Sequence, residues 1–180
     1  MPESMEELLF DAIRQKHCSN AAPFLLAIDG RAAAGKSSLA KALQAELSCP
    51  VIHMDDFFLR PEQRSPSRYE EPGGNVDRER FLQQVLLPLR QDAAFSYRPF
   101  SCAQMALAAP VHVPRSPIYI IEGCYACHPL LWPYYDLHVF LSIRPDLQKA
   151  RILARNGPAQ ANAFFQRWIP LEEHYFSAFS

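Results

Sequence analysis

The stretch Gly30 to Ser38, GRAAAGKSS, constrains the fold of this chain more than any other feature. It matches the pattern G-x-x-x-x-G-K-[ST], whose glycines let backbone N–H groups wrap a polyphosphate at the positive end of a helix dipole. This pattern works only between a buried strand and a helix. An apolar run at residues 23–30 precedes it, and a helical pattern at residues 36–47 follows it. The sequence therefore predicts a phosphate-binding loop within an α/β fold.

Three further apolar runs continue this organisation, at residues 49–56, 117–123 and 135–143. Helical patterns lie between and after them, at residues 76–91 and 145–157. Strands that alternate with helices are typical of a mostly parallel sheet covered by helices on both faces. We therefore expect a three-layer α/β architecture.

The length of 180 residues predicts a single domain spanning residues 1–180. A formal net charge of −1 gives the chain no bulk attraction for nucleic acid or for an anionic membrane. The N-terminal segment has Leu8, Leu9 and Ile13 at helical spacing and lacks the basic region of a signal peptide. No apolar segment approaches the roughly 18 residues of a membrane span. We expect a cytoplasmic protein.

Two regions have the composition of loops. Residues 60–75 are rich in Pro, Gly, Ser and charge, and most of residues 101–116 resemble them. Long loops in a compact α/β domain usually cover a site, so we expect the regions at about 60–76 and 97–116 to form its substrate side. Asn156 and Gly157 predict a helix end. This helix end makes the segment at about 144–160 a candidate lid.

The phosphate loop predicts a nucleotide site. Lys36 is expected to reach the β- and γ-phosphates of ATP, and the Ser37 hydroxyl is expected to bind Mg²⁺. The residues predicted to contact the nucleotide are Gly30, Arg31, Ala32, Ala33, Ala34, Gly35, Lys36, Ser37 and Ser38.

Carboxylates follow two of the predicted strands. Asp55 and Asp56 come after the second strand, and Glu122 ends the third. Ligands of open α/β sheets gather at the carboxyl ends of strands, so these side chains could accept a proton from a substrate hydroxyl or hold Mg²⁺. The alternative is that they only cap or solvate the strand ends.

Arg151 and Arg155 lie one helical turn apart after the fourth strand. Guanidinium groups at this spacing could bind the charge that develops on a phosphoryl group during transfer. The alternative is a solvated helix face.

The stretch Cys124 to His128 matches the haem-attachment pattern C-x-x-C-H. Covalent haem attachment belongs to exported chains, and the five cysteines are scattered. A zinc site would need a second Cys/His pair at comparable spacing. We interpret the match as a coincidence and place this loop on the acceptor side of the nucleotide site.

An ordered set of motifs resembles the uridine kinase-like branch of the P-loop small-molecule kinases, the nucleoside and pantothenate type. The set comprises IDGRAAAGKSSLAKAL, HMDDFF, EPGGNVDRERFLQQVLLPL, IYIIEGCYACHP, YDLHVFLSI, RILARNG and RWIPLEEHYF. The resemblance implies a P-loop NTPase fold with strand order 2-3-1-4, and transfer of the ATP γ-phosphate to an alcohol with Mg²⁺ bridging the phosphates.

The resemblance also implies roles for individual residues. Asp55 is similar to the family's general base, Glu122 to its Walker B acidic residue, and Arg151 and Arg155 to its lid arginines. The residues expected to contact the substrate are Asp55, Asp56, Tyr97, Glu122 and Tyr125.

The chain departs from uridine kinases at the nucleoside-reading positions. The segment Pro72 to Asp77 has glycine where the family has a ribose-binding aspartate, and Cys102 stands where the family has a pyrimidine-reading histidine. Relatives usually continue into a last strand that is not expected here. We therefore predict a kinase for a small hydroxylated metabolite that is not clearly uridine.

The alternative from another class is a nucleotide-binding switch without a small-molecule acceptor. Guanine-nucleotide switches need N-K-x-D and D-x-x-G strings, and the sequence contains neither.

Overall fold

A central parallel sheet organises the molecule, for which a computed structural model describes residues 5–17 and 22–179. Its strands in spatial order are β2 (Val51–His53), β7 (Ile118–Glu122), β1 (Phe24–Gly30) and β8 (Leu137–Leu141). All three neighbouring pairs are parallel. Numbered along the chain, these four strands have the order 2-3-1-4, which confirms the predicted α/β architecture.

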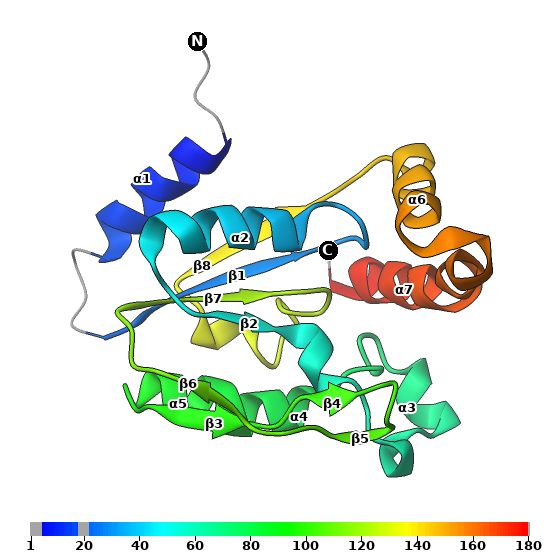
Figure 1. The fold of residues 1–180 in the computed structure, drawn as a ribbon, viewed down its shortest axis with the longest axis horizontal. Helices are drawn as coiled ribbons and strands as arrows, with labels where there is room; N and C mark the ends of the chain where they lie inside the picture. Colours follow the sequence, from blue (N-terminus) through cyan, green and yellow to red (C-terminus); the bar gives the residue numbers. More distant parts are fainter. Residues whose placement is uncertain (1–4, 18–21, 180) are drawn as a thin grey trace.

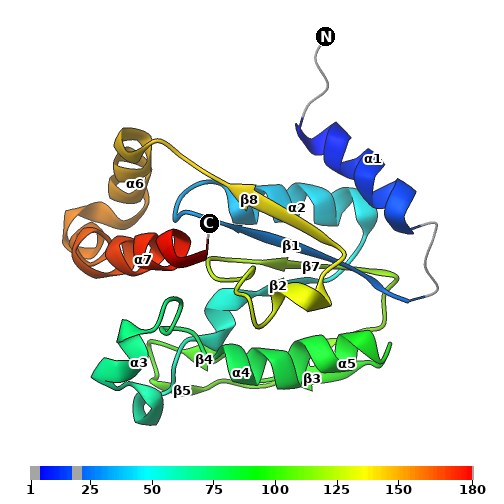
Figure 2. The ribbon, with the colours of Figure 1, turned by 180° about the vertical axis from the view of Figure 1, so that it is seen from behind.

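Helices cover both faces of the sheet (Figures 1 and 2). One face carries α1 (Met5–His17) and α2 (Lys36–Leu47). The other carries a continuous helical run of α4 (Arg78–Phe81), the π-turn η3 (Leu82–Leu86) and α5 (Leu87–Arg90). Side chains of β1 alternate between the two cores: Phe24, Leu26 and Ile28 join one, and Leu25 and Ala27 the other.

The second strand is shorter than its apolar run predicts. Strand β2 ends at His53, and the 3₁₀ turn η1 (Met54–Phe57) follows at once. This turn buries Met54 and Phe57, and it carries Asp55 and Asp56 between them. The two aspartates therefore leave the sheet on a tight turn whose apolar residues are fixed in the core.

The two predicted loop regions contain regular structure, so the expectation of plain loops was wrong in part. The first holds η2 (Pro61–Gln63) and α3 (Pro66–Glu70). The second region holds two antiparallel ribbons, β3 (Phe95–Tyr97) with β6 (Val111–Val113) and β4 (Phe100–Ser101) with β5 (Ala106–Leu107). Elements of two to five residues are too short to produce a hydrophobic period, so the sequence pattern misses them.

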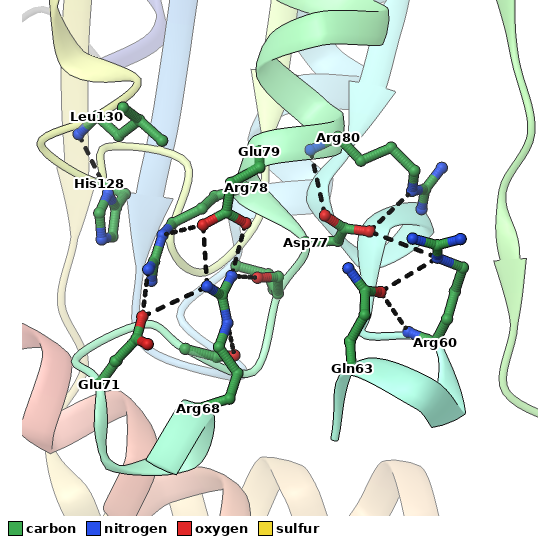
Figure 3. A network of polar contacts seen from close by, with 12 residues as sticks. Arg60, Gln63, Arg68, Glu71, Asp77, Arg78, Glu79, Arg80, His128 and Leu130 are labelled. Atoms are coloured by element: carbon green, nitrogen blue, oxygen red, sulfur yellow. Dashed lines mark hydrogen bonds and ion pairs between the residues drawn. The ribbon is translucent and has the colours of Figure 1, made fainter. Parts of the chain in front are cut away.

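A network of arginines and carboxylates fixes the first of these regions (Figure 3). Arg68 donates to the carbonyls of Gly74 and Val76 and pairs with Glu79 at 2.7 Å. A Cβ added at Gly74 would lie 1.8 Å from the carbonyl oxygen of Arg68, so only glycine fits there. The turn thus depends on the hydrogen bonds of the Arg68 side chain and on a glycine that lets the Arg68 backbone come close.

The C-terminal segment follows the short turn η4 (Trp132–Tyr134) and β8. It consists of α6 (Pro145–Ala163), the π-turn η5 (Phe164–Trp168) and α7 (Ile169–Phe179), which lie at the carboxyl ends of the strands (Figure 1). Gly157 has φ 72° and ψ 166°, so the helix breaks where an end was predicted. It resumes at the next residue, because Pro158 favours a first helical turn. No helix in the described ranges is long and apolar enough to cross a membrane.

Truncation of Phe81 should test the core beneath η1. Phe81 is fully buried and meets the Phe57 ring edge-to-face at 4.9 Å. We expect Phe81→Ala to lower the free energy of unfolding by about 3–5 kcal/mol, measured by urea denaturation. Leu8→Ala is the control, since Leu8 is 55% exposed. A loss below about 1 kcal/mol in Phe81→Ala would contradict this core.

Candidate active site

The phosphate loop leaves β1 at Gly30 and enters α2 at Lys36. Gly35 precedes the helix with φ 104°, a left-handed conformation that glycine adopts without strain. The Lys36 ammonium donates to the carbonyls of Gly30 and Arg31, at 2.7 and 2.9 Å. Its charge therefore sits at the open N-terminus of α2, whose first turn carries no carboxylate. This geometry suits an anion.

A cleft of about 1030 Å³ opens beside the loop at the carboxyl ends of the strands. The predicted site residues that line it are Ala32, Ala33, Ala34, Gly35, Lys36, Ser37, Ser38, Asp55, Glu122, Tyr125, Arg151 and Arg155. Four others do not line it: Gly30, Arg31, Asp56 and Tyr97. The structure therefore gathers the phosphate loop, two of the predicted carboxylates and both lid arginines around one space.

Ser37 and Glu122 lie together in the cleft. The Ser37 hydroxyl donates to the Glu122 carboxylate, at 3.1 and 3.2 Å to its two oxygens. The other side of Glu122 bonds His53 Nδ1 at 2.5 Å, and this hydrogen bond raises the pKa of His53. Mg²⁺ prefers oxygen ligands such as a hydroxyl and a carboxylate, so the pair fits the predicted ion.

Asp55 faces the cleft next to this pair. Burial of the Asp55 carboxylate raises its pKa, and the nearby charge of Glu122 raises the pKa further. Lys36 and His53 act in the opposite direction. A carboxylate with a raised pKa binds a proton more readily, which suits a general base.

Asp56 and Tyr97 form a pair outside the cleft lining. The buried Tyr97 hydroxyl donates to Asp56 Oδ2 at 2.7 Å. The carbonyl of Asp56 accepts from Arg80, whose guanidinium lies over the Phe57 ring at 4.2 Å. The structure therefore pairs these two predicted contact residues with each other and leaves both out of the cleft lining.

Arg151 and Arg155 reach the cleft from α6. Arg151 donates to the Ala33 carbonyl of the phosphate loop at 3.0 Å, and Arg155 lies over the Phe164 ring at 5.5 Å. Beneath them, the buried Ile152 packs with Ala32. The arginine-bearing face of α6 thus points at the loop, while Gly157 breaks the helix just beyond it.

The sequence reasoning missed Glu172, a buried carboxylate of α7 in the cleft. It accepts the backbone N–H of Ala32 at 3.0 Å, so it binds the phosphate loop as an anionic ligand would. Burial raises its pKa to about 7. The neighbouring Glu173 pairs with Arg31 at 2.7 Å, which holds α7 against the start of the loop.

Asp29 was also missed, although it directly precedes the phosphate-loop motif. Its carboxylate, 1% exposed, accepts the backbone N–H groups of Gly30, Tyr125 and Cys127 and the Tyr175 hydroxyl. The C-x-x-C-H segment is therefore wrapped around this carboxylate. Cys124 and Tyr125 line the cleft.

The ring of His128 packs away from that cleft. It stacks on Tyr175 and meets Phe179 edge-to-face, and its Nδ1 accepts the Leu130 N–H. No group of three or more His, Cys, Asp or Glu side chains in the described part of the chain is arranged to hold a metal ion.

Further cleft residues come from segments in which the sequence pattern indicated a loop or a helix without functional residues. Arg64 and Cys102 come from the two loop-rich regions, and Arg167 and Trp168 come from η5. Trp168 approaches Phe58 with ring centroids 6.5 Å apart. No sequence periodicity signals these positions, because they come from short or irregular segments that are far apart in the sequence.

Comparison with known proteins gives relatives in structure only. No family profile and no curated protein matches the sequence. Three solved structures cover nearly the whole chain.

The first carries the provisional name of a fructose transport system kinase, from Silicibacter sp. TM1040. It is 22% identical, with a TM-score of 0.78 over 97% of this chain and 95% of its own. The second, provisionally a uridine kinase from Bacillus stearothermophilus, is 21% identical with a TM-score of 0.60, covering 91% and 94%. The third, D-glycerate 3-kinase from Cryptococcus neoformans, is 15% identical with a TM-score of 0.67, covering 99% and 90%.

The chain has the fold of the P-loop kinases. This likeness confirms the resemblance inferred from the ordered motifs at the level of the fold. The same three-layer arrangement supports sugar, nucleoside and hydroxy-acid kinases by name, so the fold itself leaves the acceptor open.

The buried Glu172 should give stability a specific pH dependence. Its pKa is about 7 in the folded chain and near 4.5 when unfolded, so the folded state holds more protons between these values. Stability contributed by the protonated group is therefore lost as pH rises from about 4.5 to 7. We expect Glu172→Gln, compared with the native chain by urea denaturation, to gain relative stability between pH 5 and pH 8.

The exposed Glu46→Gln on α2 is the control and should show the same difference from the native chain at both pH values. An identical result for Glu172→Gln would contradict the raised pKa.

Proposed function

We propose that this protein is an ATP-dependent kinase that transfers the γ-phosphate to a hydroxyl of a small metabolite. The observation that carries the proposal is that Asp55, a carboxylate with a raised pKa, shares one cleft with the phosphate loop. A phosphate site alone would serve any nucleotide-binding protein. A base facing the same space is what an acceptor hydroxyl requires.

In this proposal Asp55 accepts the proton of the acceptor hydroxyl while the hydroxyl oxygen forms a bond to the γ-phosphorus. The bond from phosphorus to the bridging β-phosphate oxygen breaks, and ADP leaves. Lys36 and the loop amides hold the phosphates. Arg151 and Arg155 bind the charge that spreads over the transferring group.

Ser37 and Glu122 would hold the ion of this reaction. Bound Mg²⁺ supplies charge neutralisation across the β- and γ-phosphates. Glu122 is 5% exposed and bonded on both sides by Ser37 and His53, so its carboxylate is fixed in orientation. The two side chains that would hold the ion therefore already lie next to each other.

The acceptor is proposed to differ from uridine. Gly74 cannot carry a longer side chain, because its Cβ would meet the Arg68 carbonyl. Cys102 lines the cleft where a pyrimidine-reading histidine was expected by resemblance. The names of the three structural neighbours refer to fructose transport, uridine and D-glycerate. The acceptor of this protein must therefore be inferred from the residues that line its own cleft.

An acceptor screen tests the proposed function. Purified protein is mixed with ATP, Mg²⁺ and a panel of nucleosides, sugars, hydroxy acids and vitamin alcohols, and ADP formation is followed. We expect one chemical class to raise ADP formation at least about 100-fold over the rate without acceptor. Tight ATP binding without stimulation by any compound would instead favour a nucleotide-binding switch.

Replacement of Asp55 should separate chemistry from nucleotide binding. Asp55→Asn keeps the shape of the side chain and removes the base, so we expect kcat to fall about 10²- to 10⁴-fold while the Kd for ATP changes little. Single-turnover transfer and nucleotide titration measure the two quantities. The control is Asp11→Asn on the exposed surface of α1.

Lys36→Ala provides the comparison for Asp55→Asn, because Lys36 belongs to the phosphate loop itself. This variant should weaken both ATP binding and turnover. Equal loss of binding and turnover in Asp55→Asn would assign Asp55 to ion binding or folding instead of proton transfer.

A further inference from the structure

Arg64 differs from every other arginine of the segment that forms the acceptor side. Residues 60–80 contain five arginines, and the other four are ion-paired: Arg60 and Arg80 with Asp77, Arg68 and Arg78 with Glu79 (Figure 3). No carboxylate lies within ion-pair distance of Arg64 among residues 5–17 and 22–179. Arg64 is also the member of this set that lines the cleft.

The guanidinium of Arg64 is nevertheless held in place. Its Nε and Nη2 donate to the Leu59 carbonyl at 3.0 and 2.9 Å, and its carbon lies 5.5 Å from the centroid of the Phe100 ring. A carbonyl and a ring anchor the group without neutralising its charge. The Nη1 donors have no partner within the described ranges, so they are available to a ligand.

The cleft lining includes a second arginine in a similar state. Arg167 of η5 lies over the rings of Tyr69 and Trp168, at 4.9 and 4.7 Å, and no carboxylate pairs with it in the part of the chain described. Stacking on aromatic faces leaves the in-plane N–H groups of a guanidinium free for hydrogen bonds. Two cations therefore face the acceptor space from different segments.

The cleft is cationic although the chain as a whole is not. It is lined by five cationic side chains, Lys36, Arg64, Arg151, Arg155 and Arg167, against three carboxylates, Asp55, Glu122 and Glu172. The proposed nucleotide contacts account for Lys36, Arg151 and Arg155. Arg64 and Arg167 remain, in a chain whose formal net charge is −1.

Arg64, Asp55 and Cys102 line the same cleft. A ligand in this cleft therefore has access both to a positive group and to the proposed proton acceptor.

We propose that the acceptor is a small hydroxylated oxyanion whose carboxylate or phosphate is bound by Arg64, with its hydroxyl at Asp55. Arg167 of η5 contributes a second guanidinium. This inference rests on the proposed kinase function and narrows its substrate class. A guanidinium can donate two hydrogen bonds to an oxygen pair of a carboxylate or phosphate, whereas a neutral acceptor would offer Arg64 no charged partner.

Matched acceptor pairs test the charge requirement. The protein is assayed for ADP formation with hydroxy acids against their amides, and with sugar phosphates against the parent sugars. We expect kcat/KM for one class of anion to exceed that for its neutral partner by about 10- to 100-fold, the typical effect of a charged hydrogen bond. The two sets of pairs distinguish a carboxylate from a phosphate.

Variants of Arg64 assign the effect to this residue. Arg64→Gln should raise KM for the anionic acceptor about 10- to 100-fold, leave KM for ATP unchanged and abolish the preference over the neutral partner. Arg64→Lys should restore part of that preference, because it keeps the charge. Arg115→Gln is the control, since Arg115 pairs with Asp92 at the surface and does not line the cleft.

The outcomes separate this inference from the function on which it rests. Turnover of neutral acceptors only, at rates unaffected by Arg64→Gln, would overturn the anionic acceptor and leave the kinase function intact. An anion preference that survives Arg64→Gln would overturn the role of Arg64. Absence of turnover with every compound would reject both proposals.

Discussion

The carboxylate of Asp29 is the interaction on which the arrangement of this cleft depends. It lies at the end of the central strand and binds three segments that are distant in the sequence: the start of the phosphate loop, the loop after β7 and helix α7. Burial raises the pKa of Asp29, so placing a carboxylate there is costly unless hydrogen bonds satisfy it. Three backbone N–H groups and a tyrosine hydroxyl do so. Without this centre, the walls of the cleft would have no common point of attachment.

Two different kinds of electrostatic organisation surround that centre. Near the phosphate loop, the carboxylates have hydrogen-bond partners. Glu122 bonds Ser37 and His53, and Glu172 accepts the backbone N–H of Ala32. In residues 60–80, some arginines form ion pairs and one does not. The arginines of residues 60–80 that support the backbone are matched with carboxylates, whereas Arg64 in the cleft is held by a carbonyl and a ring. A solvent-exposed guanidinium without a carboxylate partner keeps its charged N–H donors for a ligand, which is the role proposed for Arg64.

The backbone requires glycine at position 74. A Cβ there would meet the carbonyl oxygen of Arg68, and the Arg68 side chain fixes the turn by bonding the carbonyls of Gly74 and Val76. A longer side chain at this position would therefore need a different course of the backbone. The phosphate loop, in contrast, lies between a long strand and a long helix.

The strand order was implied only by the resemblance to a known family. The sequence by itself determined the phosphate loop, the apolar strand segments, the acidic strand ends and the arginine face of α6. Each of these is encoded locally, by glycine spacing or by runs of apolar residues long enough to show a period. Only the tertiary structure decided which side chains share the cleft. It brought Glu172, Arg64 and Arg167 into the lining from segments without a pattern, and it left the hydrogen-bonded pair of Tyr97 and Asp56 out of it. The physical reason is that contacts between short elements far apart in the sequence depend on the course of the whole backbone. A local hydrophobic period carries no information about such contacts.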